Sequence, residues 1–477
     1  MIGKLSSEQL RPARGFAKRS KESNVKKKLL SATFPIALLA ATAAGFAGSA
    51  QAADDTSLTW NGITLYGVID MGILYMNHGL PMTGDIPGGM TTIAKASNKS
   101  ATVISPNGLS QSTIGLKGNI PLNDQFSAIF DLQLGFNPQS GKLTNGPGSL
   151  VQNNGVPLEQ QKAAADSARA GQLFNGQAFA GINSKDLGTL MIGRLNTFTM
   201  DNVAKYDPMN GSYAFSVIGI QGATAGGGNT ENTRLDNSVK YLYKFSPQQD
   251  LSIHVGAMYQ FGKVDSNPGE AFQANAGVDY AGFSFDALVG KKKNAVAAAP
   301  LSVAQFQSGL YPSDSLAATL SDNSVWGIGA SYRAGPVKVS GGYEHIKYQN
   351  PTSPIRTPFT GVGGYYFSIV NSNAYANAKK FDVTWLGVQY FITPKFDVTG
   401  AWYQYHQNAY GAVKCSNNSA PTCSGNLQAF SVRLDYRFNA RFDVYTGAEW
   451  SKVQDGLASG YLSTSLVAPM VGFRFKF

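Results

Sequence analysis

The residues from Val467 to Phe477 alternate in polarity with a period of two, and the chain ends on an aromatic side chain. One parity is apolar, with Val471, Phe473, Phe475 and Phe477, whereas the other is small or basic, with Gly472, Arg474 and Lys476. This pattern predicts a strand whose two faces meet different environments. In a soluble sheet such an end would fray into water, but in a transmembrane β-barrel the last strand pairs with the first and its apolar face meets lipid. The C-terminal strand therefore favours a transmembrane barrel.

The first residues follow the order of a secretory signal. Lys26, Lys27 and Lys28 form a charged region, an apolar stretch runs from 29 to about 47, and Ala50-Gln51-Ala52 supplies a cleavage motif. We therefore expect a signal peptide over residues 1–52, cut after Ala52, and a barrel domain over residues 53–477. Residues 1–24 are longer and more polar than a signal requires, so translation could instead begin near Val25. The alternative to a cleaved signal is an N-terminal membrane anchor.

The net charge of +10 at pH 7 belongs mostly to this leader. The first 52 residues hold nine Lys or Arg and two Asp or Glu, so the mature chain keeps 30 basic against 27 acidic residues. A surplus of three does not indicate a nucleic-acid partner.

The two cysteines, Cys415 and Cys423, are separated by seven small or polar residues. In an exported protein such a close pair predicts one local disulfide that fixes a loop. No cluster of His and Cys accompanies the pair, so we predict neither a metal site nor a cofactor.

Segments of about ten alternating residues recur in pairs, as in transmembrane β-hairpins, and no apolar run is long enough for a membrane helix. In 430–438, for example, aromatic and aliphatic side chains share one parity and charged ones the other. Sixteen strands are expected, at about 60–75, 109–118, 125–136, 174–184, 188–195, 234–245, 250–262, 271–281, 282–292, 323–334, 335–348, 380–392, 395–407, 427–438, 440–453 and 467–477. This even number fits a closed antiparallel barrel, and a barrel of this size leaves a water channel.

The connections between these strands alternate between short turns and long Gly-, Asn- and Ser-rich loops. Barrels of the bacterial outer membrane have short periplasmic turns and long external loops. A secreted β-sandwich also alternates in polarity, but such loops are unusual in a compact soluble domain. An interfacial aromatic girdle is expected from residues near the strand ends or lipid faces, namely Trp60, Tyr66, Trp385, Tyr390, Trp402 and Trp450.

Six short motifs, taken in order, resemble the Gram-negative trimeric general porins. They are Thr64-Leu-Tyr-Gly-Val-Ile-Asp70, Ile114-Gly-Leu-Lys-Gly118, Phe130-Asp-Leu-Gln-Leu-Gly-Phe-Asn-Pro138, Leu173-Phe-Asn-Gly-Gln-Ala178, Gly188-Thr-Leu-Met-Ile-Gly-Arg194 and Asp236-Asn-Ser-Val-Lys-Tyr241. The resemblance extends over nearly the whole mature chain. It implies a sixteen-stranded barrel, a homotrimer, and a third external loop folded into the lumen as a constriction. In one departure, Gly176 stands where the family often carries Arg, so a basic lumen group is absent from that position.

The polar parity of the strands is expected to line the pore. The candidate lumen and constriction residues are Arg194, Arg234, Lys240, Lys117, Asp70, Asp131, Asp201, Asp207 and Asp236. Over the whole polar parity twelve basic groups face nine acidic ones, which predicts a weak anion preference. Arg194 and Arg234 bracket the third loop. Arg194 shares the parity of lipid-facing residues, so either its strand ends at Gly193 or a bulge there turns the side chain inward.

Catalysis finds little support in the sequence. The four histidines lie far apart, and no Gly-x-Ser-x-Gly motif is present. We therefore predict a passive diffusion channel for ions and small hydrophilic solutes, in contact with the lipid of a Gram-negative outer membrane. The last strand is expected to present Phe477 to the barrel-insertion machinery as an assembly signal. The alternative is an outer-membrane barrel enzyme or adhesin without a channel role.

Overall fold

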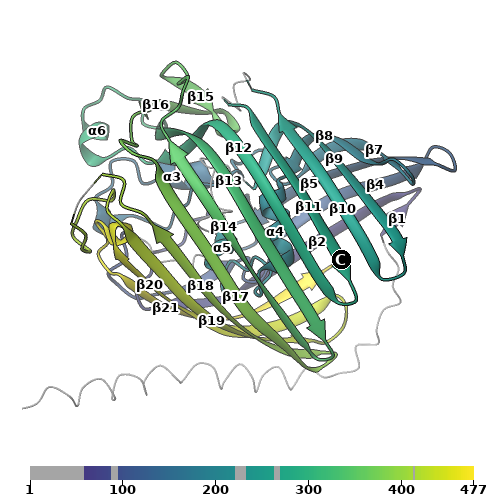
Figure 1. Cartoon of the computed structure of the whole chain (residues 1–477). Coiled ribbons are helices and arrows are strands. Elements are labelled where there is room, and N and C mark those ends of the chain that lie inside the picture. Colours follow the sequence, from purple (N-terminus) through teal and green to yellow (C-terminus); the bar gives the residue numbers. More distant parts are fainter. Residues whose placement is uncertain (1–57, 87–94, 221–232, 263–268, 412–413) are drawn as a thin grey trace, which may run out of the picture. The chain divides into compact units, whose positions relative to one another are not determined.

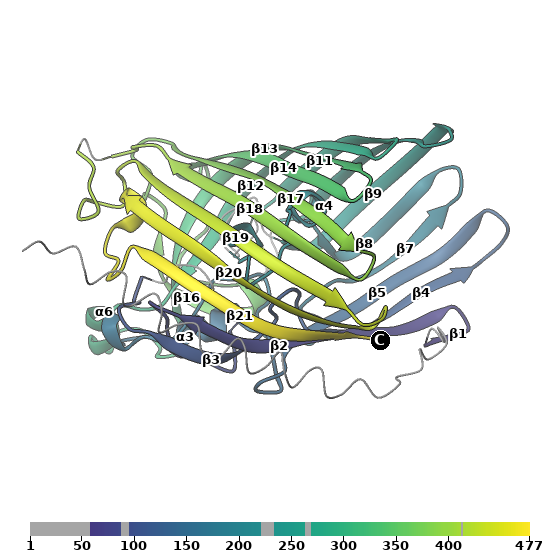
Figure 2. The same ribbon diagram turned by 90° about the horizontal axis from the view of Figure 1, so that it is seen from below.

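The computed structural model of the protein describes residues 58–86, 95–220, 233–262, 269–411 and 414–477. The expected signal peptide and its cleavage site at Ala52 lie outside these residues. In the described part of the chain, sixteen long antiparallel strands form a closed ring (Figure 1). Long loops gather at one end of the ring and short turns at the other, and the view from below shows the same arrangement (Figure 2).

The ring follows the order of the chain. Its strands are β2 (Ile63–Met76), β4 (Thr113–Pro121), β5 (Phe126–Asn137), β7 (Ala178–Ser184), β8 (Gly188–Asn196), β9 (Arg234–Gln248), β10 (Leu251–Gln260), β11 (Ala271–Tyr280), β12 (Phe283–Ala299), β13 (Leu316–Ala334), β14 (Val337–Gln349), β17 (Lys379–Thr393), β18 (Phe396–Gln407), β19 (Gly425–Arg437), β20 (Phe442–Asp455) and β21 (Ser465–Lys476). β2 and β21 pair between Val68–Lys476 and Leu74–Met470, which closes the barrel. The sixteen strands predicted from alternation are confirmed.

Shorter elements lie at the loop end or, for α4 and α5, inside the barrel. They are β3 (Ala101–Pro106), β6 (Lys142–Leu143), β15 (Phe359–Gly361), β16 (Tyr365–Asn371), α3 (Gly146–Val151), α4 (Phe198–Tyr206), α5 (Val217–Ile220), α6 (Val303–Gln307) and the 3₁₀ turns η2 (Leu158–Gln160), η3 (Val362–Gly364) and η4 (Gly456–Ala458). At the turn end, β1 (Thr59–Trp60) pairs with the start of β2. No helix in the described ranges is long and apolar enough to cross a membrane.

The second wall strand is interrupted. β2 pairs with β4 along residues 63–68 and with β3 along residues 71–76. Residues 107–112 between β3 and β4 leave the sheet as a bend, which we call the 107–112 bend. The long connection expected between the predicted strands at 60–75 and 109–118 therefore contains the outer half of this wall strand.

Alternate side chains of each strand point outward and inward. The outward side chains form an exposed apolar face, whereas many inward side chains are buried inside the barrel. On β17, the outward Leu386, Val388 and Tyr390 are 52, 45 and 50 % exposed, whereas the preceding Trp385, of the opposite parity, is 1 % exposed. Trp385 was expected in an interfacial girdle, and this expectation is wrong because its side chain lies on the inner face. Tyr66 also lies on the inner parity, where its hydroxyl donates to Asp131 Oδ1 at 2.6 Å.

The two cysteines lie in the loop between β18 and β19. Cys415 and Cys423 are joined by a disulfide, with their Cα atoms 5.5 Å apart. Cys423 is buried, and its carbonyl accepts a hydrogen bond of 2.7 Å from the Gln407 side chain. The bridge therefore fixes the loop against the end of β18 and spans no strand pair of the barrel.

The closing seam of the barrel is completed by the last residue. The N–H of Phe477 donates to the Gly67 carbonyl at 3.0 Å, and the N–H of Gly67 donates back to Phe477 at 2.9 Å. The Phe477 ring covers Gly67 so closely that a methyl group on Gly67 would lie 2.2 Å from Phe477 Cζ. A small residue in β2 and an aromatic terminus are thus matched to each other.

Deletion of Phe477 should lower the amount of folded protein in the outer membrane. The deletion removes the two backbone hydrogen bonds between Gly67 and Phe477 and uncovers Gly67, so the first and last strands pair less well. The measurement is heat-modifiable migration of outer-membrane fractions on gels, with Phe477→Tyr as the control that keeps the ring. Normal accumulation of the truncated, folded trimer would show that Phe477 has no role in assembly.

Candidate pore constriction

The loop between β8 and β9 comprises residues 197–233 (L3), and its described part, residues 197–220, folds into the barrel. Its helix α4 begins after Thr197, whose side chain accepts a hydrogen bond of 3.2 Å from the Met200 N–H. Asp201 in the first turn and Lys205 in the last turn are favourably placed with respect to the helix dipole. The buried face of α4, with Phe198, Val203 and Tyr206, packs against the inner wall.

L3 continues from α4 along the inner faces of β17 to β20. Trp385 Nε1 donates to the Tyr206 carbonyl at 3.2 Å, and the Phe215 and Tyr445 rings meet edge to face with centroids 6.2 Å apart. Met209, Phe215, Val217 and Ile218 are fully buried. Burial of these side chains supplies the hydrophobic stabilisation that holds a loop against a wall. The expected third loop inside the lumen is confirmed.

Asp207 was expected to line the pore, but only 1 % of its surface is exposed. The Tyr403 hydroxyl donates to Asp207 Oδ1 at 2.7 Å, and the N–H groups of Met209 and Gly211 donate at 3.1 and 2.6 Å. Burial raises the pKa of the Asp207 carboxyl, and these donors offset part of the rise. Asp207 therefore anchors the turn after α4 to the wall and does not face the water of the channel.

Asp70 was also expected in the lumen, and its side chain is fully buried. Asp70 accepts hydrogen bonds from Gly108 N (3.0 Å), Leu109 N (2.9 Å) and the Tyr445 hydroxyl (2.6 Å). Gly108 in turn accepts hydrogen bonds at its carbonyl from L3, from Ser212 Oγ (2.7 Å) and Ala214 N (3.0 Å). Asp70 thus holds the 107–112 bend, and the bend holds the tip of L3.

A bulge places Arg194 on the inner side of the wall. The register between β8 and β9 shifts between Gly193 and Leu195, and Gly193 has φ +139°, in the region that favours glycine. Arg194 is 9 % exposed. Its Nε donates to the Gly176 carbonyl at 2.8 Å and its Nη2 to the Ala168 carbonyl at 2.6 Å, while its Nη1 forms an ion pair with Asp236. Of the two arrangements left open by the sequence, the bulge is present.

Two further guanidinium groups lie near Arg194. Arg169 and Arg234 are 3 and 7 % exposed, and each interacts electrostatically with Arg194. Burial lowers the pKa of Arg169, and the positive charge of Arg194 lowers it further, while Tyr213 of L3 opposes the shift. We call Arg169, Arg194 and Arg234 the arginine cluster.

Arg169 was missed by sequence reasoning because it lies in a long loop without periodicity. Its Nη1 donates to Asn175 Oδ1 at 2.7 Å, which fixes the guanidinium beside the start of β7. At neighbouring Gly176 a Cβ would lie 2.4 Å from Gln133 Oε1, so a large side chain does not fit there. Arg169, seven residues earlier in the same loop, instead brings a guanidinium group close to this position.

The remaining candidate residues form two pairs, of which one lies at the base of L3. Lys240 Nζ lies 2.6 Å from Asp201 Oδ2 and donates to the Asn196 carbonyl at 2.9 Å. Asp131 accepts from Tyr66, and Lys117 lies 5.3 Å above the Tyr66 ring. The Lys240–Asp201 pair therefore lies near the arginine cluster, whereas Lys117 and Asp131 form a separate pair on β4 and β5.

The charge around the base of L3 is positive within the described part of the chain. Arg169, Arg194, Arg234 and Lys240 face Asp201 and Asp236, a surplus of two positive charges. No salt bridge joins Arg169 or Arg234 to a carboxylate of a described residue. This unbalanced charge is the main electrostatic feature of the site.

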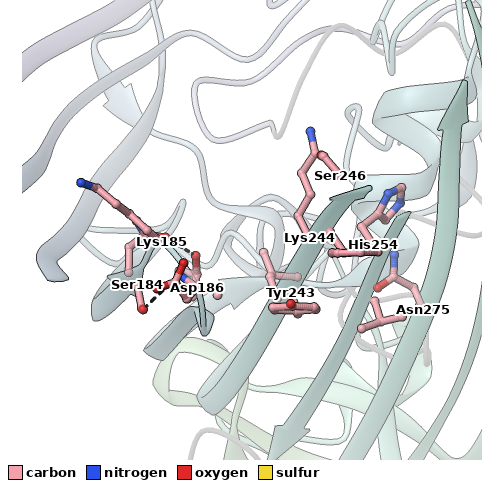
Figure 3. Close-up of a pocket in the computed structure, with 14 residues that line it drawn as sticks. Ser184, Lys185, Asp186, Tyr243, Lys244, Ser246, His254 and Asn275 are labelled. Atoms are coloured by element: carbon pink, nitrogen blue, oxygen red, sulfur yellow. Dashed lines mark hydrogen bonds between the residues drawn. The ribbon is translucent and has the colours of Figure 1, made fainter. Parts of the chain in front are cut away.

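A second polar group, near the turn end of the wall, brings Lys205 and His254 against two carboxylates. Lys205 Nζ lies 2.8 Å from Asp286 Oδ2 and 3.0 Å from Asp279 Oδ1, and His254 Nε2 lies 2.6 Å from Asp286 Oδ1. Figure 3 shows the adjoining pocket, in which Lys244, His254 and Asn275 lie on neighbouring strands opposite the turn at 184–186. This network ties the end of α4 to β11 and β12.

The closed sixteen-stranded barrel, the apolar outer face and the loop packed inside it define a pore-forming protein of the outer membrane. A family model described as Gram-negative porin matches residues 37–456, and the chain belongs to this family. The chain is 26 % identical over 424 residues to an outer membrane porin protein of Bordetella pertussis, covering 87 % of this chain and 93 % of that protein.

Two solved structures illustrate the same fold. The anion-selective porin from Comamonas acidovorans superposes with a TM-score of 0.58 at 17 % identity, covering 87 % of this chain and 99 % of that one. OmpT, an outer membrane protein of Vibrio cholerae, superposes with a TM-score of 0.53 at 13 % identity, covering 88 % of this chain and 100 % of that one. The predicted family, fold and outer-membrane location are confirmed.

Proposed function

We propose that this porin forms a water-filled channel through which ions and small hydrophilic solutes diffuse passively, with a weak preference for anions and without enzymatic activity. The observation that carries the preference is the arginine cluster, in which neither Arg169 nor Arg234 forms a salt bridge with a carboxylate of a described residue. Charges beside a narrow passage act on a partly dehydrated ion at short range, where screening by salt is weaker than at a wide mouth.

The comparisons give this preference limited support. The Comamonas acidovorans protein is described as anion-selective, but at 17 % identity its likeness to this chain is one of fold. The anion preference therefore rests on the charges of this chain, and above all on the surplus of two at the base of L3.

We further propose a homotrimer as the working assembly, with outer-membrane lipid around it. A structure of OmpT from Vibrio cholerae is described as a trimer form, and its fold resembles this chain with a TM-score of 0.51. Removal of residues 1–52 on export, with cleavage after Ala52, and recognition of the C-terminal strand by the insertion machinery belong to the same proposal.

Conductance of the purified trimer in planar lipid bilayers tests the channel function. We expect discrete conductance steps, and in a KCl gradient a zero-current potential displaced toward the equilibrium potential of chloride. The displacement should shrink as salt rises, because screening weakens the arginine cluster's field. A folded trimer without conductance would contradict the channel function, whereas a displacement toward potassium would contradict only the anion preference.

A further inference from the structure

Two loops from opposite walls of the barrel meet over its external mouth. Residues 138–177 (L2) leave the wall between the third and fourth strands, β5 and β7, and residues 350–378 (L6) leave it between the eleventh and twelfth, β14 and β17. In a ring of sixteen strands these points are eight strands apart, which is half of the circumference. The Tyr365 hydroxyl of L6 nevertheless lies 2.8 Å from Asn145 Nδ2 of L2.

The meeting point has an apolar core of its own. β12 and β13 extend beyond a register shift between Lys292 and Ala295, and β16 pairs in parallel with the start of β13. Helix α3 of L2 packs on this small sheet. The buried side chains between them are Leu150, Val296, Leu316, Ala318, Leu320 and Phe367. Such a core makes the contact a folded substructure and not a frayed loop.

Polar contacts fix the far end of L2 in the same place. Asn154 Nδ2 donates to the carbonyls of Ser313 and Ser315 at 2.9 and 2.8 Å, and Asn154 Oδ1 accepts from Leu301 N at 2.7 Å. On the returning part of L2, Asp166 Oδ2 accepts from Ala298 N at 3.0 Å. Both passes of the loop are therefore hydrogen-bonded to the end of β12 or to the connection that follows it, six strands around the ring from β5.

We propose that residues 147–166 of L2, seated on β12, β13, β15 and β16, form a bridge across the external mouth that limits the size of solutes reaching L3. The inference rests on the proposed channel function and adds a second barrier in series with the constriction. Small ions pass beside the bridge and are sorted by the arginine cluster. Large neutral solutes are excluded before they reach that cluster, so size limit and charge preference reside in different loops.

The bridge can be deleted without changing the residues on either side of it. A Cβ on Gly146 would lie 2.6 Å from Ser167 Cβ, so the two ends of the bridge are in contact and can be joined directly. A variant that lacks residues 147–166 keeps Arg169 and the Arg194 contacts to Ala168 and Gly176. The double variant Asn154→Ala, Asp166→Ala loosens the bridge in a chain of full length, and Gln160→Ala changes an exposed side chain of the same loop as a control.

The test is the swelling rate of proteoliposomes in arabinose and in raffinose. In the deletion variant the ratio of the raffinose to the arabinose rate should rise severalfold, and in the double variant it should rise less. The zero-current potential of both variants in a KCl gradient should stay at the wild-type value. The Gln160→Ala variant should keep the wild-type ratio of sugar rates. A conducting deletion variant with the wild-type sugar ratio would overturn the bridge. If the deletion variant does not fold, an unchanged ratio in the double variant overturns it. Absence of conductance in the wild type would instead refute the channel function itself.

Discussion

Replacement of Asp70 by Ala should release the tip of L3 and raise both the conductance and the current noise of the open channel. The carboxylate is the common acceptor of the 107–112 bend and of the Tyr445 hydroxyl. Each donor left buried without an acceptor costs about 1–3 kcal/mol, so the folded barrel should also be less stable. Single-channel recordings and the temperature at which heat-modified migration appears on gels measure the two effects.

The matched control for this variant is Asp124→Ala, which removes an exposed carboxylate from the turn between β4 and β5. This control should conduct and melt like the wild type. Asp70→Asn keeps one acceptor oxygen and should lie between the wild type and Asp70→Ala. Wild-type conductance in Asp70→Ala would mean that the contacts of Ser212 and Ala214 with Gly108 do not hold the loop.

Neutralisation of Arg234 should move the selectivity of the channel toward cations. In Arg234→Gln one of the two surplus positive charges at the base of L3 is lost. A unit charge at about 6 Å contributes on the order of 1 kcal/mol at effective dielectric constants near that of water, before salt screens it. The chloride-to-potassium permeability ratio should therefore fall about two- to fivefold. The zero-current potential in a KCl gradient is the readout.

Arg194 is unsuitable for this test because it binds the carbonyls of Ala168 and Gly176, and its loss would also displace L2. Lys185→Gln is the matched control, since it removes one positive charge from the short turn between β7 and β8, away from L3. An equal shift in Lys185→Gln and Arg234→Gln would assign the anion preference to the overall charge of the wall and not to the arginine cluster.

The strands were predictable because two solvents impose a strict parity on each of them. The prediction failed where that condition fails. In β17, Phe381, Val383 and Trp385 are buried on the inner face because L3, and not water, lies against them. At its loop end this strand therefore has apolar residues on both faces. Alternation of polarity alone cannot distinguish a tryptophan that points into the barrel from one that lies at the membrane interface.

The ends of β12 and β13 were missed for a related reason. Both strands run seven residues beyond their predicted limits at 292 and 323. The register shift near Asn294, which has φ +48°, exchanges the parities, and the Ala-rich segment that follows has little contrast between its faces. The bridge that rests on this extension was accordingly not foreseen.

The candidate site was predicted in part. Arg194, Arg234, Lys240, Asp201 and Asp236 do come together at the base of L3, because strand ends and loop ends are adjacent in the sequence. Asp70 was assigned to the lumen by strand parity and Asp207 because it lies in the third loop. The side chains of both are buried in loop contacts that depend on tertiary structure. Arg169 reaches the site from L2, and no sequence pattern in that loop predicts that its side chain lies beside Arg194.

The seam between Gly67 and Phe477 has a consequence for how the barrel is made. The paired residues Asp70 and Arg474 are 404 positions apart, and direct closure of such a loop costs about 5 kcal/mol of chain entropy. Hairpins such as the one that joins β13 to β14 close over only a few residues, so the sheet can grow through local steps while its curvature brings the two ends together. Throughout that growth β2 and β21 remain open edges, with unpaired N–H and C=O groups that can template pairing with another chain. The chain is therefore most vulnerable to aggregation in the interval just before its final residue reaches Gly67.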